Sequence, residues 1–370
     1  MTQFRNYDRQ TAEFSPAMNI LYGPNGSGKT TVLEAIHCLA VAKSFKTHYD
    51  RHLVQHNTDF YQLEGEFSND NKTDLIQLNY MPNKGKKLFI NKAEQDKLSI
   101  VVGRYPVVTL TPEDGEITTG PPAVRRKYIN KMMSQASSDH MENLIQLGKV
   151  LDQRNAILQD AADSNAGKVD ETLISVYDDQ LITEAAKIEK ARQEFFENFR
   201  ALFQTVYESL NGLERSVQIR FSPSVAYEND DQFDSEFREA LDRRRNQELA
   251  FRRTMVGPQS DVIDLYMDGN SLREYGSQGE HKIILIGLKL AEGRYIANAK
   301  NQSPIYLFDD LFAELDIQRS QRILSALDDR GQMLITSTDL SDVRQHGIDI
   351  SGEGIKVFDM EEFKSQGAAA

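Results

Sequence analysis

The feature that most constrains this chain is the pattern G-x-x-x-x-G-K-T at residues 23–30. The apolar run MNILY at 18–22 precedes it, and TTVLEAIHCLA follows it with apolar side chains at helical spacing. Glycines let backbone N–H groups wrap closely around phosphate oxygens, and the start of a helix favours a bound anion. The pattern therefore predicts a strand, a phosphate-binding loop and a helix, as in P-loop nucleotide-binding proteins.

Each residue type in this loop has an expected role. Lys29 is expected to neutralise the β- and γ-phosphate oxygens, and the Thr30 hydroxyl is placed for Mg²⁺. A chance glycine-rich turn would not need both the strand and the helix, so we expect ATP and Mg²⁺ as cofactors. The predicted ATP-binding residues are Gly23, Pro24, Asn25, Gly26, Ser27, Gly28, Lys29, Thr30 and Thr31.

A second apolar strand, IYLF at 305–308, ends in two acids. Asp309 is expected to hold Mg²⁺ through its water shell. Asp310 stands where ABC-type ATPases usually carry the glutamate that polarises the attacking water. Because aspartate is shorter, we expect slow hydrolysis, with Asp310 and Lys29 as the catalytic residues. The alternative is a solvated turn at the end of a strand.

The segment YGSQGE at 275–280 runs into the helical sequence HKIILIGLKLAE. It is similar to the ABC signature, whose serine and free helix N–H groups can coordinate a γ-phosphate presented by another subunit. By itself the tripeptide is equally well explained by an N-capping serine. The acidic strand downstream, followed by Glu314-Leu315-Asp316 as a D-loop, favours the signature. We therefore predict Ser277, Gln278 and Gly279 as signature residues acting in trans, Asp316 as the D-loop acid, and dimerisation driven by ATP.

The middle of the chain changes from strand-like to helical spacing at about residue 123. One apolar stripe runs from Leu144 to Leu158 and a second from Leu181 to Leu210, with DSNAG at 163–167 between them. Two such helices are expected to pack as an antiparallel hairpin. Strands and helices alternate again towards the C-terminus. We expect an α/β fold in which an ABC-type ATPase head (a P-loop NTPase) is split into residues 1–111 and 255–370, with 112–254 as an inserted helical arm.

Composition limits the function classes. The single cysteine, Cys38, excludes an internal disulfide framework and a cysteine-based zinc site. No apolar run approaches the ~18 residues of a membrane span, and the first residues do not resemble a secretory signal. We therefore expect a soluble cytoplasmic protein. With a net charge of −13, any DNA site must be a local basic patch.

Three basic clusters are candidates for such a patch. The first lies on a hairpin predicted from the strands 74–80 and 87–92, the second at the base of the arm, and the third near residue 244. They would bind phosphates with little sequence preference. The alternative is a solvated helix face, or, for Arg125 and Arg126, a brace for the head. The candidates are Lys84, Lys86 and Lys87; Arg125, Arg126 and Lys127; and Arg243 to Arg245.

Several segments together resemble the RecF family, nearly from end to end. They are QFRNYD, NILYGPNGSGKTTVLEAIHCLA, AKSFKT at 42–47, LTPEDGEITTGPPAVRRKYIN at 110–130, RRRNQELAFRRTMVGP at 243–258, YGSQGEHKIILIGLKLAE and LFDDLFAELD. The resemblance implies a bacterial, cytoplasmic, DNA-binding ATPase of replication, recombinational repair and the SOS response. It also implies work with RecO and RecR to place the RecA recombinase on single strands coated with single-strand-binding protein.

Three departures from the family pattern stand out. Gln259 and Ser260 replace the usual His-Arg, Glu280 replaces a common glutamine, and most of the usual opening strand is missing before QFRNYD. The last departure predicts a truncated or locally different start. An SMC- or Rad50-like head is an alternative, disfavoured by the short helical insert. A transporter-type ABC subunit is a second alternative, disfavoured by the repair-like segments.

Overall fold

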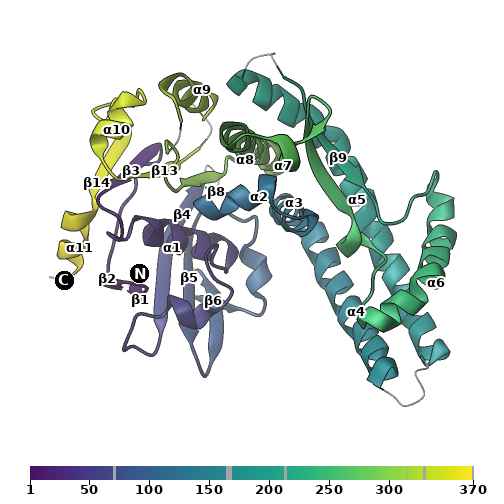
Figure 1. The fold of residues 1–370 in the computed structure, drawn as a ribbon. Coiled ribbons are helices and arrows are strands. Elements are labelled where there is room, and N and C mark those ends of the chain that lie inside the picture. Colours follow the sequence, from purple (N-terminus) through teal and green to yellow (C-terminus); the bar gives the residue numbers. More distant parts are fainter. Residues whose placement is uncertain (70–71, 164–168, 212–214, 314, 328–330, 369–370) are drawn as a thin grey trace. The chain divides into compact units, whose positions relative to one another are not determined.

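The computed structural model describes residues 1–370 except 70–71, 164–168, 212–214, 314, 328–330 and 369–370 (Figure 1). The chain forms two compact units. We call the first the head unit; it comprises Met1–Gly115, Thr205–Leu213 and Gln278–Ala370. We call the second the arm unit; it comprises Glu116–Gln204 and Glu214–Ser277.

A five-stranded parallel sheet forms the centre of the head unit. Its order is β14 (Ile355–Asp359), β3 (Met18–Tyr22), β13 (Met333–Ser337), β12 (Ile305–Phe308) and β8 (Val107–Leu110). These strands are short and rich in apolar residues, as expected of a sheet buried on both faces. Because all five run in the same direction, the loops after β3, β12 and β13 leave the sheet at one edge.

Helices surround this sheet, in keeping with the alternation of strands and helices. They are α1 (Lys29–Val41), α8 (Gln278–Lys300), α9 (Ile317–Leu327), α10 (Leu340–Gln345) and α11 (Met360–Ala368), with short 3₁₀ turns at Asp50–Leu53, Leu98–Val101 and Pro112–Gly115. Helix α1 begins directly after the glycine-rich loop and ends at Ala42, which caps it in a left-handed conformation.

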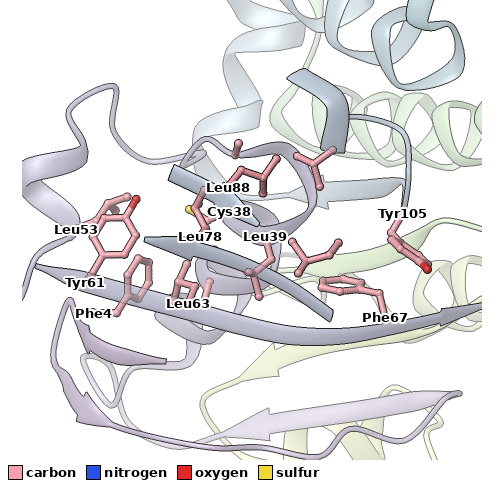
Figure 2. Packing of buried hydrophobic residues seen from close by; sticks show 14 residues of the cluster. Phe4, Cys38, Leu39, Leu53, Tyr61, Leu63, Phe67, Leu78, Leu88 and Tyr105 are labelled. Carbon is pink, nitrogen blue, oxygen red and sulfur yellow. The ribbon is translucent and has the colours of Figure 1, made fainter. Parts of the chain in front are cut away.

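A second, six-stranded antiparallel sheet belongs to the same unit. Its order is β2 (Tyr7–Arg9), β1 (Thr2–Phe4), β4 (Tyr61–Asn69), β5 (Lys72–Met81), β6 (Gly85–Ile90) and β7 (Ala93–Gln95). One face packs on α1, where Cys38 and Leu39 meet Leu63 and Leu78 (Figure 2). Cys38 is a buried free thiol. The predicted hairpin is confirmed as β5–β6, in which Tyr80 pairs with Lys86.

The arm unit is mainly helical. Helices α4 (Ser138–Asp163) and α5 (Glu171–Asn211, in this unit as far as Gln204) run side by side (Figure 1). Leu147 of α4 shares a buried cluster with Leu181 and Ile188 of α5, so the predicted helical hairpin is confirmed. Of the predicted break at 163–167, residues 164–167 lie outside the described residues. The other helices are α2 (Glu116–Thr119), α3 (Pro122–Ala136), α6 (Phe233–Phe251) and α7 (Leu272–Tyr275), with 3₁₀ turns at Asp230–Gln232 and Pro258–Ser260.

A small antiparallel sheet completes the arm unit and changes where its boundary falls. The order is β11 (Asn270–Ser271), β10 (Val262–Met267) and β9 (Val217–Ser222). Strand β10 pairs with β9 from Val262–Ser222 to Met267–Val217. Residues 255–277, expected within the second part of the head, therefore fold with the arm unit. Among the described residues, no helix is long and apolar enough to cross a membrane.

Candidate nucleotide-binding site

The glycine-rich loop joins β3 to α1, as its sequence predicts. Gly28 is the residue before the helix and adopts a φ of 104°, in the left-handed region that favours glycine. A Cβ at this position would lie 2.4 Å from the hydroxyl oxygen of Tyr7. Position 28 therefore requires glycine for two reasons: its backbone conformation and the close approach of Tyr7. Pro24, Asn25 and Gly26 are exposed at the tip of the loop.

Lys29 lies inside the curl of this loop. Its Nζ donates hydrogen bonds to the carbonyl oxygens of Gly23 at 2.5 Å and Pro24 at 3.0 Å. Burial lowers the pKa of Lys29, while the nearby Asp309 and Asp310 carboxylates act in the opposite direction. The ammonium group is thus held where backbone N–H groups can surround a phosphate, and it can exchange carbonyl partners for phosphate oxygens.

Asp309 meets the P-loop at the edge of the parallel sheet. The Thr30 hydroxyl lies 3.0 and 2.8 Å from its two carboxylate oxygens. Thr336, at the end of the intervening strand β13, donates to Asp309 Oδ1 at 2.8 Å. Two hydroxyl groups from separate strands and loops therefore fix the orientation of this carboxylate.

Asp310 is the next residue and has an exposed side chain. Its backbone adopts a φ of 57°, and its N–H donates to Thr336 Oγ1 at 2.9 Å. Partial burial and the neighbouring Asp309 raise the pKa of Asp310, which Lys282 and Lys29 partly offset. Non-glycine residues seldom adopt this backbone conformation, and such outliers cluster at functional sites.

The residues present fit a magnesium nucleotide. A hydroxyl and a carboxylate, the oxygen ligands that Mg²⁺ prefers, lie within hydrogen-bonding distance of each other at Thr30 and Asp309. Mg²⁺ usually takes one or two carboxylates and completes its shell with phosphate oxygens and water. No cluster of three or more His, Cys, Asp or Glu side chains suited to a metal occurs among the described residues. At a site of this kind a bound nucleotide and water would supply the oxygen ligands that these two side chains do not.

The signature segment directly precedes helix α8. Ser277 is exposed and is the last residue of the arm unit, and Gln278 is the first residue of the helix. The Arg319 guanidinium nitrogen lies 3.6 Å from the place of a Cβ on Gly279. Arg319 also forms an ion pair with Asp316, the predicted D-loop acid. Glu314, expected in the same loop, lies outside the described residues.

Asp316 also has a structural role. Its Oδ1 accepts a hydrogen bond from the Arg319 backbone N–H at 2.8 Å, just before α9 begins at Ile317. This is an N-cap arrangement, which satisfies one of the free donors at the start of the helix. Asp316, the predicted D-loop acid, and Gly279 of the predicted signature thus approach the same arginine within the head unit.

Sequence reasoning did not find Thr336 or Tyr7. Thr336 bridges the two acids, and the hydroxyl of Tyr7 lies 3.5 Å from the Ser27 carbonyl oxygen. Burial raises the pKa of Tyr7 to about 12, so it stays protonated at neutral pH. Thr336 stands at the end of the apolar run QMLIT at 332–336, and this position after a predicted strand was the available signal.

Only part of the predicted basic patch on the hairpin is open to solvent. Lys86 is nearly buried; it pairs with Asp50 at 2.5 Å and donates to the Ala42 carbonyl at 2.8 Å. The charge of Lys86 is therefore used inside the head unit, and its contact with DNA stays a prediction. Lys84, in the turn, is exposed, and Lys87 is exposed and pairs with Glu94 at 2.7 Å.

The cluster on α3 is divided in the same way. Arg125 is 3% exposed, donates to the backbone oxygens of Ile117, Gly120 and Ile263, and pairs with Asp264 at 2.6 Å. These contacts brace the arm unit and so favour the alternative of a structural role for Arg125; its contact with DNA stays a prediction. Arg126 is half-buried and donates to the Asp261 carbonyl, and Lys127 is exposed.

The third cluster lies on α6. Arg245 is mostly buried and pairs with Asp178 at 2.8 Å, so its charge is largely used within the arm unit. Arg243 is exposed and pairs with Glu239 on the same helix, while Arg244 donates to the side chain of Gln247. Only two members of this cluster therefore present their charge at the surface.

Comparison with known proteins agrees with this architecture. The family model for the RecF/RecN/SMC N-terminal domain matches residues 1–351. A "DNA replication and repair protein RecF" of Salinibacter ruber is 35% identical over 91% of this chain and 83% of its own length. Another RecF, of Chlorobaculum tepidum, is 32% identical over 99% of this chain and 97% of its own length.

Solved structures give the same relationship. The recombination mediator protein RecF-ATPrS of the RecFOR pathway superposes with a TM-score of 0.85 at 27% identity, covering 92% of this chain and 91% of that one. An Smc head bound to the C-winged helix domain of ScpA is 15% identical with a TM-score of 0.52, covering 93% and 89%, and shows the likeness of fold alone. With the parallel sheet, the split head and the helical insert described above, the chain belongs to the RecF family of DNA replication and repair proteins, within the RecF/RecN/SMC group.

Proposed function

We propose that this chain is an ATP-dependent DNA-binding protein of recombinational repair. ATP binding drives two chains to dimerise, the dimer binds duplex or gapped DNA, and the complex helps to load recombinase onto single-stranded gaps. Slow hydrolysis of ATP then resets the dimer. By family resemblance its partners are RecO and RecR, and its location is the bacterial cytoplasm.

The observation that carries the proposal is the meeting of the P-loop with the acidic strand. Lys29, Thr30 and Asp309 come from opposite ends of the chain and converge at one edge of the parallel sheet. This is the arrangement that P-loop proteins use for a magnesium nucleotide. Solved RecF structures named with ATP and ATPrS support ATP as the nucleotide.

The side chain of Asp310 supports slow hydrolysis. It follows the Mg²⁺-binding acid directly and is exposed, so it can face an attacking water. An aspartate reaches less far than the glutamate usual at this position, so it is less well placed to polarise that water. Ser277 and Gly279 at the start of α8 would contact the γ-phosphate held by the second head.

The test of this proposal is DNA binding as a function of nucleotide. Fluorescence anisotropy with a labelled duplex and a gapped duplex of unrelated sequences should show tighter binding with ATP than without it. Ser277→Arg should abolish the ATP effect, because a bulky cation blocks the second head. Glu280→Arg introduces an arginine three residues further along the chain. It tests whether the loss of the ATP effect is specific to position 277. Equal affinity of the wild-type protein with and without ATP would overturn the proposal.

A further inference from the structure

The arm unit contains a cavity of about 910 Å³, within the size range of ligand-binding sites. Its described lining residues include no acidic side chain. They include four arginines: Arg126, Arg243, Arg244 and Arg253. This is a concentration of positive charge on a chain whose net charge is −13. Gln259 and Ser260, which replace the usual His-Arg of the family, line the same cavity.

Most of this charge is not neutralised nearby. Among the described residues, the exposed Arg253 guanidinium has no hydrogen-bond or ion-pair partner. The groups that Arg126 and Arg244 contact, a carbonyl and an amide, carry no charge. Arg243 pairs only with Glu239, and both side chains are more than half exposed, so this pair contributes little.

The wall that carries Arg253 is fixed by a buried network. Arg154 is 0% exposed and bonds Asp178, Glu248 and Thr254 at 2.7, 2.7 and 2.8 Å. Asn155 accepts from the backbone N–H of Thr254 at 2.6 Å. The residue after Arg253 is therefore held to α4 and α6 before any ligand arrives.

Hydrogen bonds also fix the part of the wall around Ser224. Ser224 exchanges hydrogen bonds with the N–H and the carbonyl of Gly257, and its own N–H donates to Asp261 Oδ1 at 2.8 Å. Asp261 in turn forms a buried ion pair with Arg192, and its carbonyl accepts from Arg126. Burial and the neighbouring Arg192 lower the pKa of Arg126, while the Asp261 carboxylate acts in the opposite direction. A cavity fixed in this way loses little conformational entropy when it binds a ligand.

We propose that this cavity binds phosphate groups of a nucleic-acid backbone and provides a DNA contact in the arm unit. The inference rests on the proposed DNA-binding function and assigns it to a particular surface. Arginine suits this ligand because its planar fork of donors matches two phosphate oxygens at once. Phosphate contacts of this kind carry no sequence information, so the site would accept unrelated sequences.

The experiment replaces only the three exposed arginines, which lie outside the buried network. Arg243→Ala, Arg244→Ala and Arg253→Ala are combined, and anisotropy with a labelled duplex is measured with ATP over a series of salt concentrations. We expect affinity to fall on the order of tenfold or more, and the log–log salt slope to flatten by about 0.9 for each DNA phosphate that the variant no longer neutralises. ATP affinity should be unchanged.

Two matched variants separate the site from general charge. Lys149→Ala, Lys187→Ala and Lys190→Ala remove the same charge from exposed positions of α4 and α5, outside the cavity. This control should keep the wild-type slope. Replacing the three arginines by lysine should restore the slope but only part of the affinity, because the charge returns without the forked geometry.

The outcomes distinguish this inference from the proposed function. If the alanine variant keeps the wild-type affinity and slope, the cavity is not a DNA contact, and ATP-dependent DNA binding stands. If the wild-type protein with ATP binds no DNA, the proposed function fails and nucleic acid fails as the occupant. Inorganic tripolyphosphate is titrated into the Lys29→Met variant, which lacks the P-loop lysine. If tripolyphosphate binds there through the arginines and DNA does not displace it, the cavity is a site for free polyphosphate instead. If polyglutamate displaces the tripolyphosphate and DNA does not, the occupant is an acidic protein segment.

Discussion

The Thr30 hydroxyl and a carboxylate oxygen of Asp309 lie 2.8 Å apart, although 279 positions separate them in the sequence. The contact exists because β3 and β12 run parallel with only β13 between them, so their following loops meet. The two groups most suited to Mg²⁺ are thus brought together by sheet topology.

Thr30 and Asp309 should act as one unit. Thr30→Val and Asp309→Asn are each expected to weaken ATP binding in Mg²⁺ while leaving the affinity measured in EDTA nearly unchanged. The double variant should lose little more than either single variant, because both remove the same ion. Isothermal titration with ATP in the two buffers gives all the values. Additive losses of ATP affinity would mean that the two residues do not act through the same Mg²⁺ ion.

Asp310→Asn should separate nucleotide binding from hydrolysis. Loss of a general base typically slows a reaction by about 10²–10⁴-fold, and we expect a decrease in this range with ATP affinity retained. Asp342→Asn is the control, because Asp342 influences the pKa of Asp310 from α10 and is not next in sequence to Asp309, the proposed Mg²⁺ ligand. Single-turnover hydrolysis measures both variants. Wild-type turnover in Asp310→Asn would remove this residue from the mechanism.

Arg154→Met should destabilise the arm unit strongly. The substitution leaves the buried Glu248 and Asp178 carboxylates without their shared cation, which typically costs about 3–5 kcal/mol. Lys149→Met, exposed on the same helix, should change the free energy of unfolding by no more than about 0.5 kcal/mol. Urea unfolding followed by circular dichroism compares them. Similar stabilities would show that the buried network is not needed for folding.

Glu189 should make the stability of the arm unit depend on pH. Burial and the nearby Asp261 raise the pKa of Glu189 to about 8, whereas a glutamate in the unfolded chain titrates near its usual value of 4.5. Between these values the folded state keeps a proton that the unfolded state releases. The stabilisation is therefore complete below about pH 4.5 and is lost as the pH rises towards 8, by at most about 1.4 kcal/mol per pH unit.

Glu189→Gln removes this titration and should flatten the pH dependence. Urea unfolding at pH 5, 6, 7 and 8 should show the wild-type protein losing stability relative to the variant at each step. Glu194→Gln, at an exposed position on the same helix, should follow the wild-type curve. A constant difference between wild type and Glu189→Gln would show that Glu189 does not titrate in this range.

Local patterns in the sequence predict the strands, the P-loop and the helical hairpin, because each depends on residues close together in the chain. The strand MNILY at 18–22 coincides with β3, and the apolar stripe from Leu181 marks the buried face of α5. The folding of 255–277 with the arm unit was not predictable in this way, since it depends on β10 pairing with the distant β9.

The basic residues show the same limit. Lys86 and Arg125 look like their neighbours in sequence, but each is buried against an acid far along the chain. For Arg125 a signal was present: Ile129 and Met132, four and seven residues later, lie on the same helical face and are buried. A charge at such a spacing is more safely assigned to the interior of a fold than to a ligand.

The central claim is that ATP in the P-loop brings two heads together, and sedimentation velocity with and without ATP tests it most directly. The wild-type protein should become a dimer with ATP, whereas Lys29→Met should bind no ATP, remain a monomer and melt as the nucleotide-free wild type does. Ser277→Arg should bind ATP and also remain a monomer. An ATP-dependent dimer formed normally by Ser277→Arg, or wild-type ATP affinity in Lys29→Met, would contradict the account.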